Sequence, residues 1–304
     1  MRPRPSSAVA VAVEAPTAST LLSDYKELLK PGITAFVVVM AAAGYLLGAT
    51  GPVDWVVLLG LMAGTGLTGG GAAALNHVAE RRFDAQMART AARPVAAGRM
   101  GPAHATLYAA ACVVLGAVVL AATTNGLTTA LALLTVALYV GVYTPLKRRT
   151  VHNTLVGAIP GALPALGGAA AATGALDATG WALFAILYLW QLPHFYALAW
   201  LLRDDYRRGG FRMLPSVDGG ERQLAGLVLL ATLALLVAGV LPAAVGHAGM
   251  LFLVGMVAVG TAFAIPAFSF FSVPTDDRAR RLLLASIAYV PAFFVLVVAD
   301  FLLR

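Results

Sequence analysis

Cysteine and charge are both scarce in this sequence. One Cys in 304 residues excludes a disulfide framework within the chain and a zinc site built from several thiolates. That residue, Cys112, lies in an apolar run and is expected only to pack. Charged residues make up 12% of the chain and hydrophobic residues 60%, and the mean hydropathy is +0.84. A soluble domain has about 25% charged residues, so the composition excludes that class and predicts a polytopic membrane protein.

Apolar runs recur along the chain at the length that a membrane helix needs, about 20 residues. Many are rich in Gly and Ala, and small residues let helices approach closely in a membrane. Pro160 and Pro164 fall inside one run and indicate a kinked helix beside a cavity. The predicted fold is therefore all-α, with nine transmembrane helices around a central cavity. The predicted spans are 31–50, 55–78, 103–122, 126–145, 153–173, 178–201, 223–246, 249–271 and 282–303.

The region before the first span has two parts. Residues 1–22 show no helical periodicity and are expected to form a disordered cytoplasmic tail. Leu21–Lys30 alternates apolar and charged residues at helical spacing, which is typical of an amphipathic helix on the membrane surface. Residues 23–304 are expected to form a single transmembrane domain.

The basic residues gather on one side of this topology. The net charge is +7, from 21 Lys and Arg against 14 Asp and Glu. All of the basic residues except Arg304 fall before the first span or in the second, fourth, sixth and eighth loops between spans. This positive-inside pattern predicts a multi-pass protein of the cell membrane with a cytoplasmic N-terminus and an outside C-terminus. Topology and an anionic substrate account for the charge, so membrane lipid is an expected partner and nucleic acid is not.

A polar motif follows the second apolar run. Asn76, Glu80 and Asp84 are spaced at i, i+4 and i+8, which places them along one helix face. Carboxylate and amide oxygens suit Mg²⁺, which typically binds through one or two carboxylates and substrate phosphates. Arg89 and Arg93 follow, and guanidinium groups bind phosphate oxygens bidentately. The segment predicts a magnesium diphosphate site, although a loop whose arginines only fix topology remains an alternative.

A second cytoplasmic cluster lies at the end of the sixth span. Asp204 and Asp205 stand there, ten and eleven residues after His194. A helix rises about 15–17 Å over that length, so His194 is expected inside the membrane and the Asp pair near its surface. Two acidic clusters at helix ends on one face can hold cations from opposite sides.

These features resemble the UbiA-type intramembrane prenyltransferases. The spacing of Asn76, Glu80 and Asp84 resembles their first aspartate-rich motif, and nine helices with two cytoplasmic acidic motifs fit their fold. Within that superfamily, five segments look like protohaem IX farnesyltransferases, also called haem O synthases. They are M-A-R-T-A-A-R-P-V (87–95), Y-T-P-L-K-R-R-T (143–150), G-A-I-P-G-A-L-P-A-L-G-G (157–168), W-Q-L-P-H-F (190–195) and D-D-Y-R-R-G-G-F-R-M-L-P (204–215). The resemblance departs at Glu80, where aspartate is commoner, and at the adjacent Asp204 and Asp205.

The resemblance implies an enzyme that joins farnesyl diphosphate to a vinyl group of haem b and releases diphosphate. The product is haem O, which serves the biogenesis of haem-copper oxidases, and haem A synthase or oxidase assembly factors are the implied protein partners. Mg²⁺ is the expected cofactor. For this reaction we expect catalysis by Asn76, Glu80, Asp84 and Asp205, metal binding by Asn76, Glu80, Asp84, Asp204 and Asp205, diphosphate binding by Arg89, Arg93, Lys147 and Arg148, and haem binding by His194. Tyr143, Trp190 and Tyr196 are candidates for a cation–π contact with the allylic cation.

Two other classes compete with this interpretation. A sister enzyme that prenylates an aromatic ring, such as 4-hydroxybenzoate, would share the first motif, but W-Q-L-P-H-F counts against it. A lipid or anion transporter would place its binding groups near the bilayer midplane, whereas the acids here cluster at one membrane face.

Overall fold

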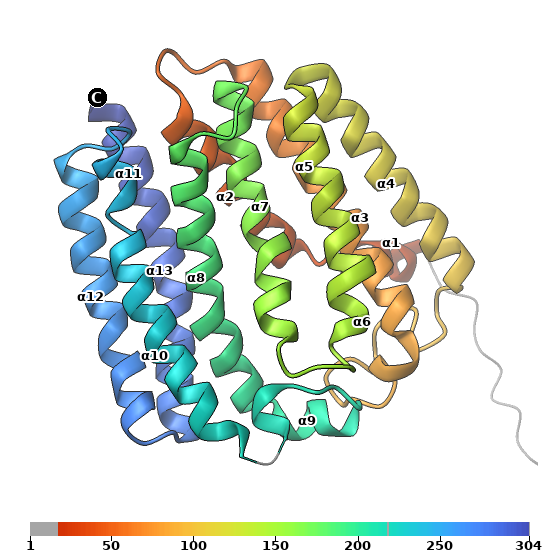
Figure 1. The fold of residues 1–304 in the computed structure, drawn as a ribbon. Coiled ribbons are helices and arrows are strands. Elements are labelled where there is room, and N and C mark those ends of the chain that lie inside the picture. Colours follow the sequence, from red (N-terminus) through yellow and green to blue (C-terminus); the bar gives the residue numbers. More distant parts are fainter. Residues whose placement is uncertain (1–17, 218, 304) are drawn as a thin grey trace, which may run out of the picture.

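The computed structural model describes residues 18–217 and 219–303, and within them it is built from helices without strands (Figure 1). The α-helices are α1 (Ala18–Leu28), α2 (Pro31–Gly48), α3 (Trp55–Asp84), α4 (Pro102–Thr123), α5 (Gly126–Val136), α6 (Thr144–Leu146), α7 (Asn153–Thr173), α8 (Ala178–Leu201), α9 (Arg203–Arg208), α10 (Gly220–Ala238), α11 (Leu241–Ala244), α12 (Met250–Ser272) and α13 (Asp276–Leu303). A π-helix, η1 (Ala137–Tyr143), joins α5 to α6, and a 3₁₀ turn, η2 (Leu214–Ser216), precedes α10.

The prediction of nine spans is confirmed for the described residues. Nine helices or joined helices are long and apolar enough to cross a membrane. The largest differences in length are in α3, which ends at Asp84 rather than near residue 78, and in α13, which begins at Asp276 rather than near residue 282. The Asp54 carboxylate accepts the backbone N–H groups of Val56 and Val57 and so caps the start of α3, while the Thr90 hydroxyl donates to the Asp84 carbonyl oxygen at its end. Helix α3 therefore carries the whole polar motif on one continuous scaffold.

Helix α1 is docked on the bundle. It begins at Ala18, within the segment expected to be a tail, and the rest of that segment, residues 1–17, lies outside the described residues. Asp24 of α1 is buried and forms a 2.8 Å ion pair with Arg99 of the loop between α3 and α4. Leu28 is fully buried in an apolar cluster with Ala74 of α3. The amphipathic helix therefore fixes the chain just before α2.

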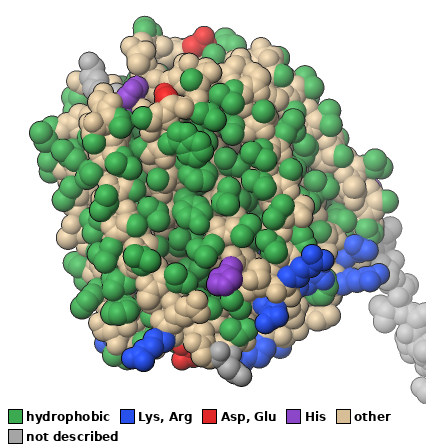
Figure 2. All heavy atoms as spheres, viewed as in Figure 1, with side chains coloured by type: hydrophobic (Ala, Val, Ile, Leu, Met, Phe, Trp, Pro, Cys, Tyr) green, Lys and Arg blue, Asp and Glu red, His purple; other side chains and the backbone are tan. Residues whose placement is uncertain are grey.

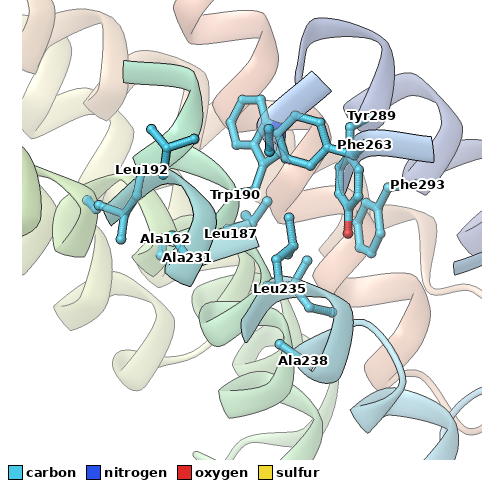
Figure 3. Packing of buried hydrophobic residues seen from close by; sticks show 14 of the residues in the cluster. Ala162, Leu187, Trp190, Leu192, Ala231, Leu235, Ala238, Phe263, Tyr289 and Phe293 are labelled. Atoms are coloured by element: carbon cyan, nitrogen blue, oxygen red, sulfur yellow. The ribbon is translucent and has the colours of Figure 1, made fainter. Parts of the chain in front are cut away.

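Small residues bring α2 and α7 into close contact. A Cβ added at Gly168 of α7 would overlap the carbonyl oxygen of Ala41, and one added at Gly44 of α2 would overlap that of Ala165. This packing is what Gly- and Ala-rich membrane helices allow. Helices α8, α10, α12 and α13 enclose the largest apolar cluster of the described residues, and its side chains are larger than those between α2 and α7 (Figure 3). It includes Leu187, Trp190, Leu235, Phe263, Tyr289 and Phe293.

The two ends of the bundle differ in charge. Helix α9 and the loop between α3 and α4 lie at one end, and the C-terminus lies at the other (Figure 1). Figure 2 shows Lys and Arg side chains gathered toward the α9 end of the visible face and hydrophobic side chains across its middle. The predicted charge asymmetry is thus present in the folded protein, and the polar motif lies at its basic end.

Candidate active site

A cavity opens at the basic end of the bundle. Its wall combines the last turns of α3, the loop that follows, the start of α2 and the end of the fourth span. The residues that line it are Lys30, Asn76, Glu80, Asp84, Met87, Arg89, Arg93, Tyr143, Lys147, Tyr206, Phe211 and Met213. Oxygen ligands, basic groups and aromatic rings therefore face one space.

The three motif residues of α3 meet in this cavity as predicted from their spacing. Asn76, Glu80 and Asp84 are 1%, 4% and 1% exposed. Two carboxylates this deeply buried require cationic partners. Each residue of the motif has one basic partner, and the contacts are Lys30 Nζ to Asn76 Oδ1 at 2.9 Å, Lys147 Nζ to Glu80 Oε1 at 2.9 Å and Arg93 Nη1 to Asp84 Oδ2 at 2.8 Å.

Lys30 reaches the motif from a strained backbone position. Its φ of 47° and ψ of 65° make it the one non-glycine residue with positive φ in the described part of the chain, and it precedes Pro31. Left-handed backbone costs a residue with a Cβ about 1–2 kcal/mol, and a residue before proline normally adopts extended backbone. Burial, followed by repulsion from Arg93 and Lys147, lowers the pKa of Lys30 to about 7. Lys30 was not among the site residues predicted from the sequence, where its only signal is that of a basic residue between α1 and the first span.

Lys147 is held by the end of the fourth span. A Cβ added at Gly157 of α7 would overlap the Tyr143 ring, so glycine there lets that ring pack on α7 beneath Lys147. The Lys147 ammonium lies 4.7 Å from the centroid of the Tyr143 ring. Burial opposes its charge, but the Glu80 carboxylate together with Tyr139 and Tyr206 outweighs burial, so the pKa of Lys147 is raised. Lys147 is therefore a permanent cation in the cavity wall.

The same segment orients Asn76. The Asn76 amide donates from Nδ2 to the Thr144 hydroxyl at 3.1 Å, which leaves Oδ1 toward Lys30. Thr144 in turn donates to the carbonyl oxygen of Tyr139, inside the π-helix η1. π-Helical turns are rare and frequently occur at functional sites. Here η1 positions both Thr144 and Lys147 against α3.

The second acidic cluster does not join the first in this arrangement. Asp205 is 8% exposed, and its Oδ1 accepts the Ala88 backbone N–H at 3.1 Å and an Arg208 Nη2 hydrogen at 2.9 Å. It thus holds the loop after α3 instead of lining the cavity. Asp204 is exposed and forms a 3.1 Å ion pair with Arg207, also outside the cavity.

The predicted diphosphate-binding residues divide into two groups. Arg89, Arg93 and Lys147 line the cavity. Arg148 is exposed, and its guanidinium carbon lies 4.1 Å from the centroid of the Phe83 ring, outside the cavity lining. Three of the four predicted basic residues thus line the cavity, but the directions of the adjacent side chains of Lys147 and Arg148 could not be predicted from the sequence.

His194 lies away from this cavity, between α8 and α13. Its Nδ1 is 2.8 Å from the Ser286 hydroxyl, and its ring stacks on Trp190 with centroids 5.1 Å apart. The Ser286 hydroxyl donates to the Leu283 carbonyl oxygen at 2.6 Å. Nδ1 of His194 therefore carries the proton and donates to Ser286, which leaves a lone pair on Nε2. A neutral imidazole fixed in this way is suited to binding a metal.

The aromatic candidates also separate in the structure. Tyr143 lines the cavity, whereas Trp190 and Tyr196 are 5% and 1% exposed within the apolar core. The Trp190 ring nitrogen donates to the backbone carbonyl of Ser286. Tyr143 is therefore the one candidate of the three that the fold presents to the polar site.

A second cavity lies among α2, α3, α5 and α7. Three of its threonines direct their hydroxyls to backbone carbonyl oxygens: Thr68 to Gly64, Thr128 to Gly167 and Thr135 to Leu131. Their hydroxyl hydrogens are thereby bound to backbone carbonyl oxygens, so these parts of the wall behave as an apolar surface. The lining is Val37, Leu61, Thr65, Thr68, Gly69, Ala72, Thr128, Leu131, Ala132, Thr135, Val136, Leu163, Pro164 and Gly167.

The donor set of the polar cavity fits Mg²⁺. In the described part of the chain no three His, Cys, Asp or Glu side chains cluster as a self-sufficient metal site. The motif instead offers two carboxylates and an amide, and Mg²⁺ commonly completes such a set with substrate phosphates and water. Asp84 Oδ1 is buried without a hydrogen-bond partner, which leaves one carboxylate oxygen available for a cation.

Comparison with known proteins agrees with this geometry. Residues 37–297 match the model of the UbiA prenyltransferase family. A protoheme IX farnesyltransferase of Salinibacter ruber is 46% identical over 93% of this chain and its own full length, and one of Solibacter usitatus is 40% identical over 92% of this chain and 99% of that protein. A UbiA homologue from Archaeoglobus fulgidus, solved with GPP and Mg²⁺, superposes with a TM-score of 0.62 at 17% identity, over 90% of this chain and 99% of that one. The chain belongs to the UbiA prenyltransferase family and, within it, to the protoheme IX farnesyltransferases.

Proposed function

We propose that this protein transfers the farnesyl group of farnesyl diphosphate to a vinyl group of haem b and so forms haem O and diphosphate. The observation that carries the proposal is the buried cavity in which two carboxylates and an amide face Lys30, Arg93 and Lys147. The relatives named protoheme IX farnesyltransferase support this choice of substrates. In the reaction the allylic carbon–oxygen bond breaks, a carbon–carbon bond forms to the vinyl group, and water supplies the hydroxyl and loses a proton.

Asn76, Glu80 and Asp84 are the proposed ligands of Mg²⁺. When bound there, the metal would neutralise charge on the leaving diphosphate. The A. fulgidus homologue solved with GPP and Mg²⁺ supports this use of the fold. Asp204 is left out of the set because its side chain is exposed and paired with Arg207.

The basic wall binds the diphosphate oxygens. Arg89, Arg93 and Lys147 line the cavity, and they stabilise negative charge that grows as the carbon–oxygen bond breaks. Tyr143 presents its ring in the same cavity and is the proposed partner of the allylic cation. A cation–π contact of this kind is worth about 2 kcal/mol when water is excluded.

The apolar cavity is the proposed site of the farnesyl chain. Both cavities are lined by α3, from Leu61 and Ala72 in the apolar one to Asn76 and Asp84 in the polar one. From Asn76 back to Leu61 the helix rises about 22 Å, a length that accommodates a fifteen-carbon chain. An apolar wall also keeps water from the allylic cation before the vinyl carbon reacts.

His194 is the proposed contact with haem. The lone pair on Nε2 suits the haem iron, and the hydrogen bond from Nδ1 to Ser286 fixes the ring. His194 lies seven residues before α8 ends at Leu201, about 10 Å along the helix axis, which agrees with a haem that enters the membrane while the diphosphate stays at the basic end.

The basic end is proposed to face the cytoplasm, with the C-terminus outside the cell membrane, because Lys and Arg concentrate at that end and loops rich in Lys and Arg are normally cytoplasmic. The transmembrane bundle is proposed to act as one domain. Use of haem O by haem-copper oxidases, with haem A synthase or assembly factors as neighbours, stays a prediction.

The direct test is a reaction of purified protein in lipid nanodiscs with haem b, farnesyl diphosphate and Mg²⁺. We expect a haem product of the mass of haem O together with released diphosphate. A prenylated 4-hydroxybenzoate, with no haem product, would instead identify the sister enzyme. Passage of substrate through a vesicle membrane without diphosphate release would identify a transporter.

A further inference from the structure

Each residue of the α3 motif is paired with a different cation, and each cation comes from a different segment. Lys30 lies at the start of α2, Arg93 lies in the loop after α3, and Lys147 follows α6. Three independent pairs in one cavity are more than the charge of the motif requires, since Asn76 carries no charge. The three basic residues therefore have a role beyond neutralising two buried carboxylates.

We propose that Lys30, Arg93 and Lys147 act as internal counter-ions of the α3 motif and move from the motif to the diphosphate oxygens when substrate binds. A divalent cation then takes their place at the motif, so that the cation and the prenyl diphosphate each favour binding of the other. This inference rests on the proposed function, because it takes the ligands of that site as given. It assigns to Lys30 a positioning role at Asn76.

Charge explains why neither ligand binds well alone. With all groups ionised, three cations against two carboxylates leave the six-residue set at +1. The Asp84 and Glu80 side chains are 1% and 6% exposed, and those of Arg93 and Lys147 are 16% and 15% exposed, so solvent screens these charges weakly. A divalent cation must approach oxygens that already hold cations within about 3 Å, where repulsion in a poorly solvated site is large.

Diphosphate alone meets the opposite obstacle. Its oxygens attract the three cations, but each cation that turns to diphosphate leaves a buried oxygen of Glu80, Asp84 or Asn76 without its partner. Removing one partner from a buried ion pair is strongly unfavourable. When both ligands are present, the cations pair with phosphate and the motif oxygens pair with metal, so every charge has a partner.

The structure permits this exchange through side chains. The Lys30 carbonyl accepts the Thr34 N–H at 3.0 Å, and the Thr34 hydroxyl donates to the Leu29 carbonyl at 2.6 Å, which fixes the left-handed turn. Leu29 also packs on Gly70 of α3, where a Cβ would lie 2.9 Å from a Leu29 methyl carbon. The backbone at Lys30 is therefore held, while its four-carbon side chain retains the freedom to change partner.

Binding measurements on the full-length protein without haem test the exchange. Mn²⁺ binding is followed by electron paramagnetic resonance, and binding of farnesyl thiodiphosphate, which resists ionisation, is followed with a radiolabel in EDTA and in Mn²⁺. We expect each ligand to tighten the other at least tenfold, after correction for their complex in solution. The two factors must agree, because thermodynamic coupling is reciprocal.

The Lys30→Met variant is the decisive test, because the proposal predicts opposite changes in its affinities for the two ligands. Loss of the cation at Asn76 is expected to raise the affinity for Mn²⁺ alone at least threefold and to lower the affinity for farnesyl thiodiphosphate at least threefold. Lys30→Arg is expected to retain the wild-type pattern, and Lys26→Met on the exposed face of α1 is the matched control that changes neither. A structural role for Lys30 would weaken both ligands together.

Arg93→Met and Lys147→Met extend the test to the other two pairs. Each variant is again expected to bind Mn²⁺ more tightly and farnesyl thiodiphosphate more weakly. Weaker Mn²⁺ binding in all three variants, or independent binding of the two ligands to the wild-type protein, overturns the proposal. No haem and no turnover enter these measurements. Failure of the exchange and failure of farnesyl transfer are therefore separate results.

Discussion

Arg93 donates to Asp84 across a 2.8 Å ion pair in which the acidic side chain is 1% exposed. The pair folds the loop after α3 back onto the end of that helix. The same loop is held from the other side, where Ala88 donates its backbone N–H to Asp205. One short segment thus connects the two acidic clusters, although their carboxylates do not meet.

Asp84→Ala is expected to lower kcat at least 100-fold in a protein that still inserts and folds. The variant removes a proposed metal ligand and leaves Arg93 without its partner. Haem O formation and thermal unfolding in detergent are the measurements. Near-normal turnover at saturating Mg²⁺ would show that Asp84 does not bind the metal. As a second arm, Glu80→Asp should retain more activity than Glu80→Gln, because the charge that faces Lys147 and the metal is kept.

The spans and the first motif could be predicted because each depends on local spacing. Apolar runs of about 20 residues define membrane helices, and Asn76, Glu80 and Asp84 share a face on any helix that is continuous through them. Lys30 could not be found in this way. Its contact with Asn76 depends on a left-handed residue before Pro31 and on the packing of Leu29 against α3, which are tertiary features.

The sequence likewise could not predict which of two adjacent side chains points into the site. Lys147 faces Glu80 while Arg148 stacks on Phe83, and Asp205 is buried while Asp204 is exposed. In α9 a step of one residue turns a side chain by about 100°, and Lys147 and Arg148 lie in the turn that follows α6. Only the packing of the surrounding segments decides which member of such a pair reaches the site.

Removal of divalent metal is expected to abolish turnover. Excess EDTA should stop haem O formation, and added Mg²⁺ should restore it. A zinc-selective chelator should have no effect, because the motif offers hard oxygen ligands and the chain has a single Cys. Full activity in EDTA would remove the metal from the mechanism.

His194→Ala is expected to weaken haem binding at least tenfold while leaving the affinity for farnesyl thiodiphosphate unchanged. The physical reason is the loss of the Nε2 lone pair, since His194 lies outside the diphosphate cavity. Ser286→Ala is a milder variant, because it keeps the imidazole but removes the acceptor of its Nδ1 proton. Haem absorption spectra of the two variants are the measurement. Wild-type haem affinity and spectrum in His194→Ala would exclude this residue as the contact with haem.

The apolar cavity is expected to set the length of the prenyl chain. Leu131→Ala enlarges its wall and should raise kcat/KM for geranylgeranyl diphosphate relative to farnesyl diphosphate at least fivefold. The cost in stability is about 2–5 kcal/mol for a buried leucine, so unfolding is measured alongside. Leu107→Ala on the exposed surface of α4 is the matched control. An unchanged preference in a folded Leu131→Ala protein would place the chain elsewhere.

Asp205→Ala is expected to lower kcat about tenfold to 100-fold while haem binding stays normal. In the structure Asp205 Oδ1 accepts from the Ala88 backbone and from Arg208, so its loss releases the loop that carries Arg89 and Arg93. Asp205→Asn keeps an oxygen for the Ala88 N–H and should recover part of the activity if the residue positions the loop. A residue that binds metal through its charge would not be rescued in this way, and Mn²⁺ affinity would fall in both variants. Asp204→Ala is the matched control, because its exposed pair with Arg207 is worth less than about 1 kcal/mol. Equal loss of activity in Asp204→Ala and Asp205→Ala would contradict the distinction between the two acids.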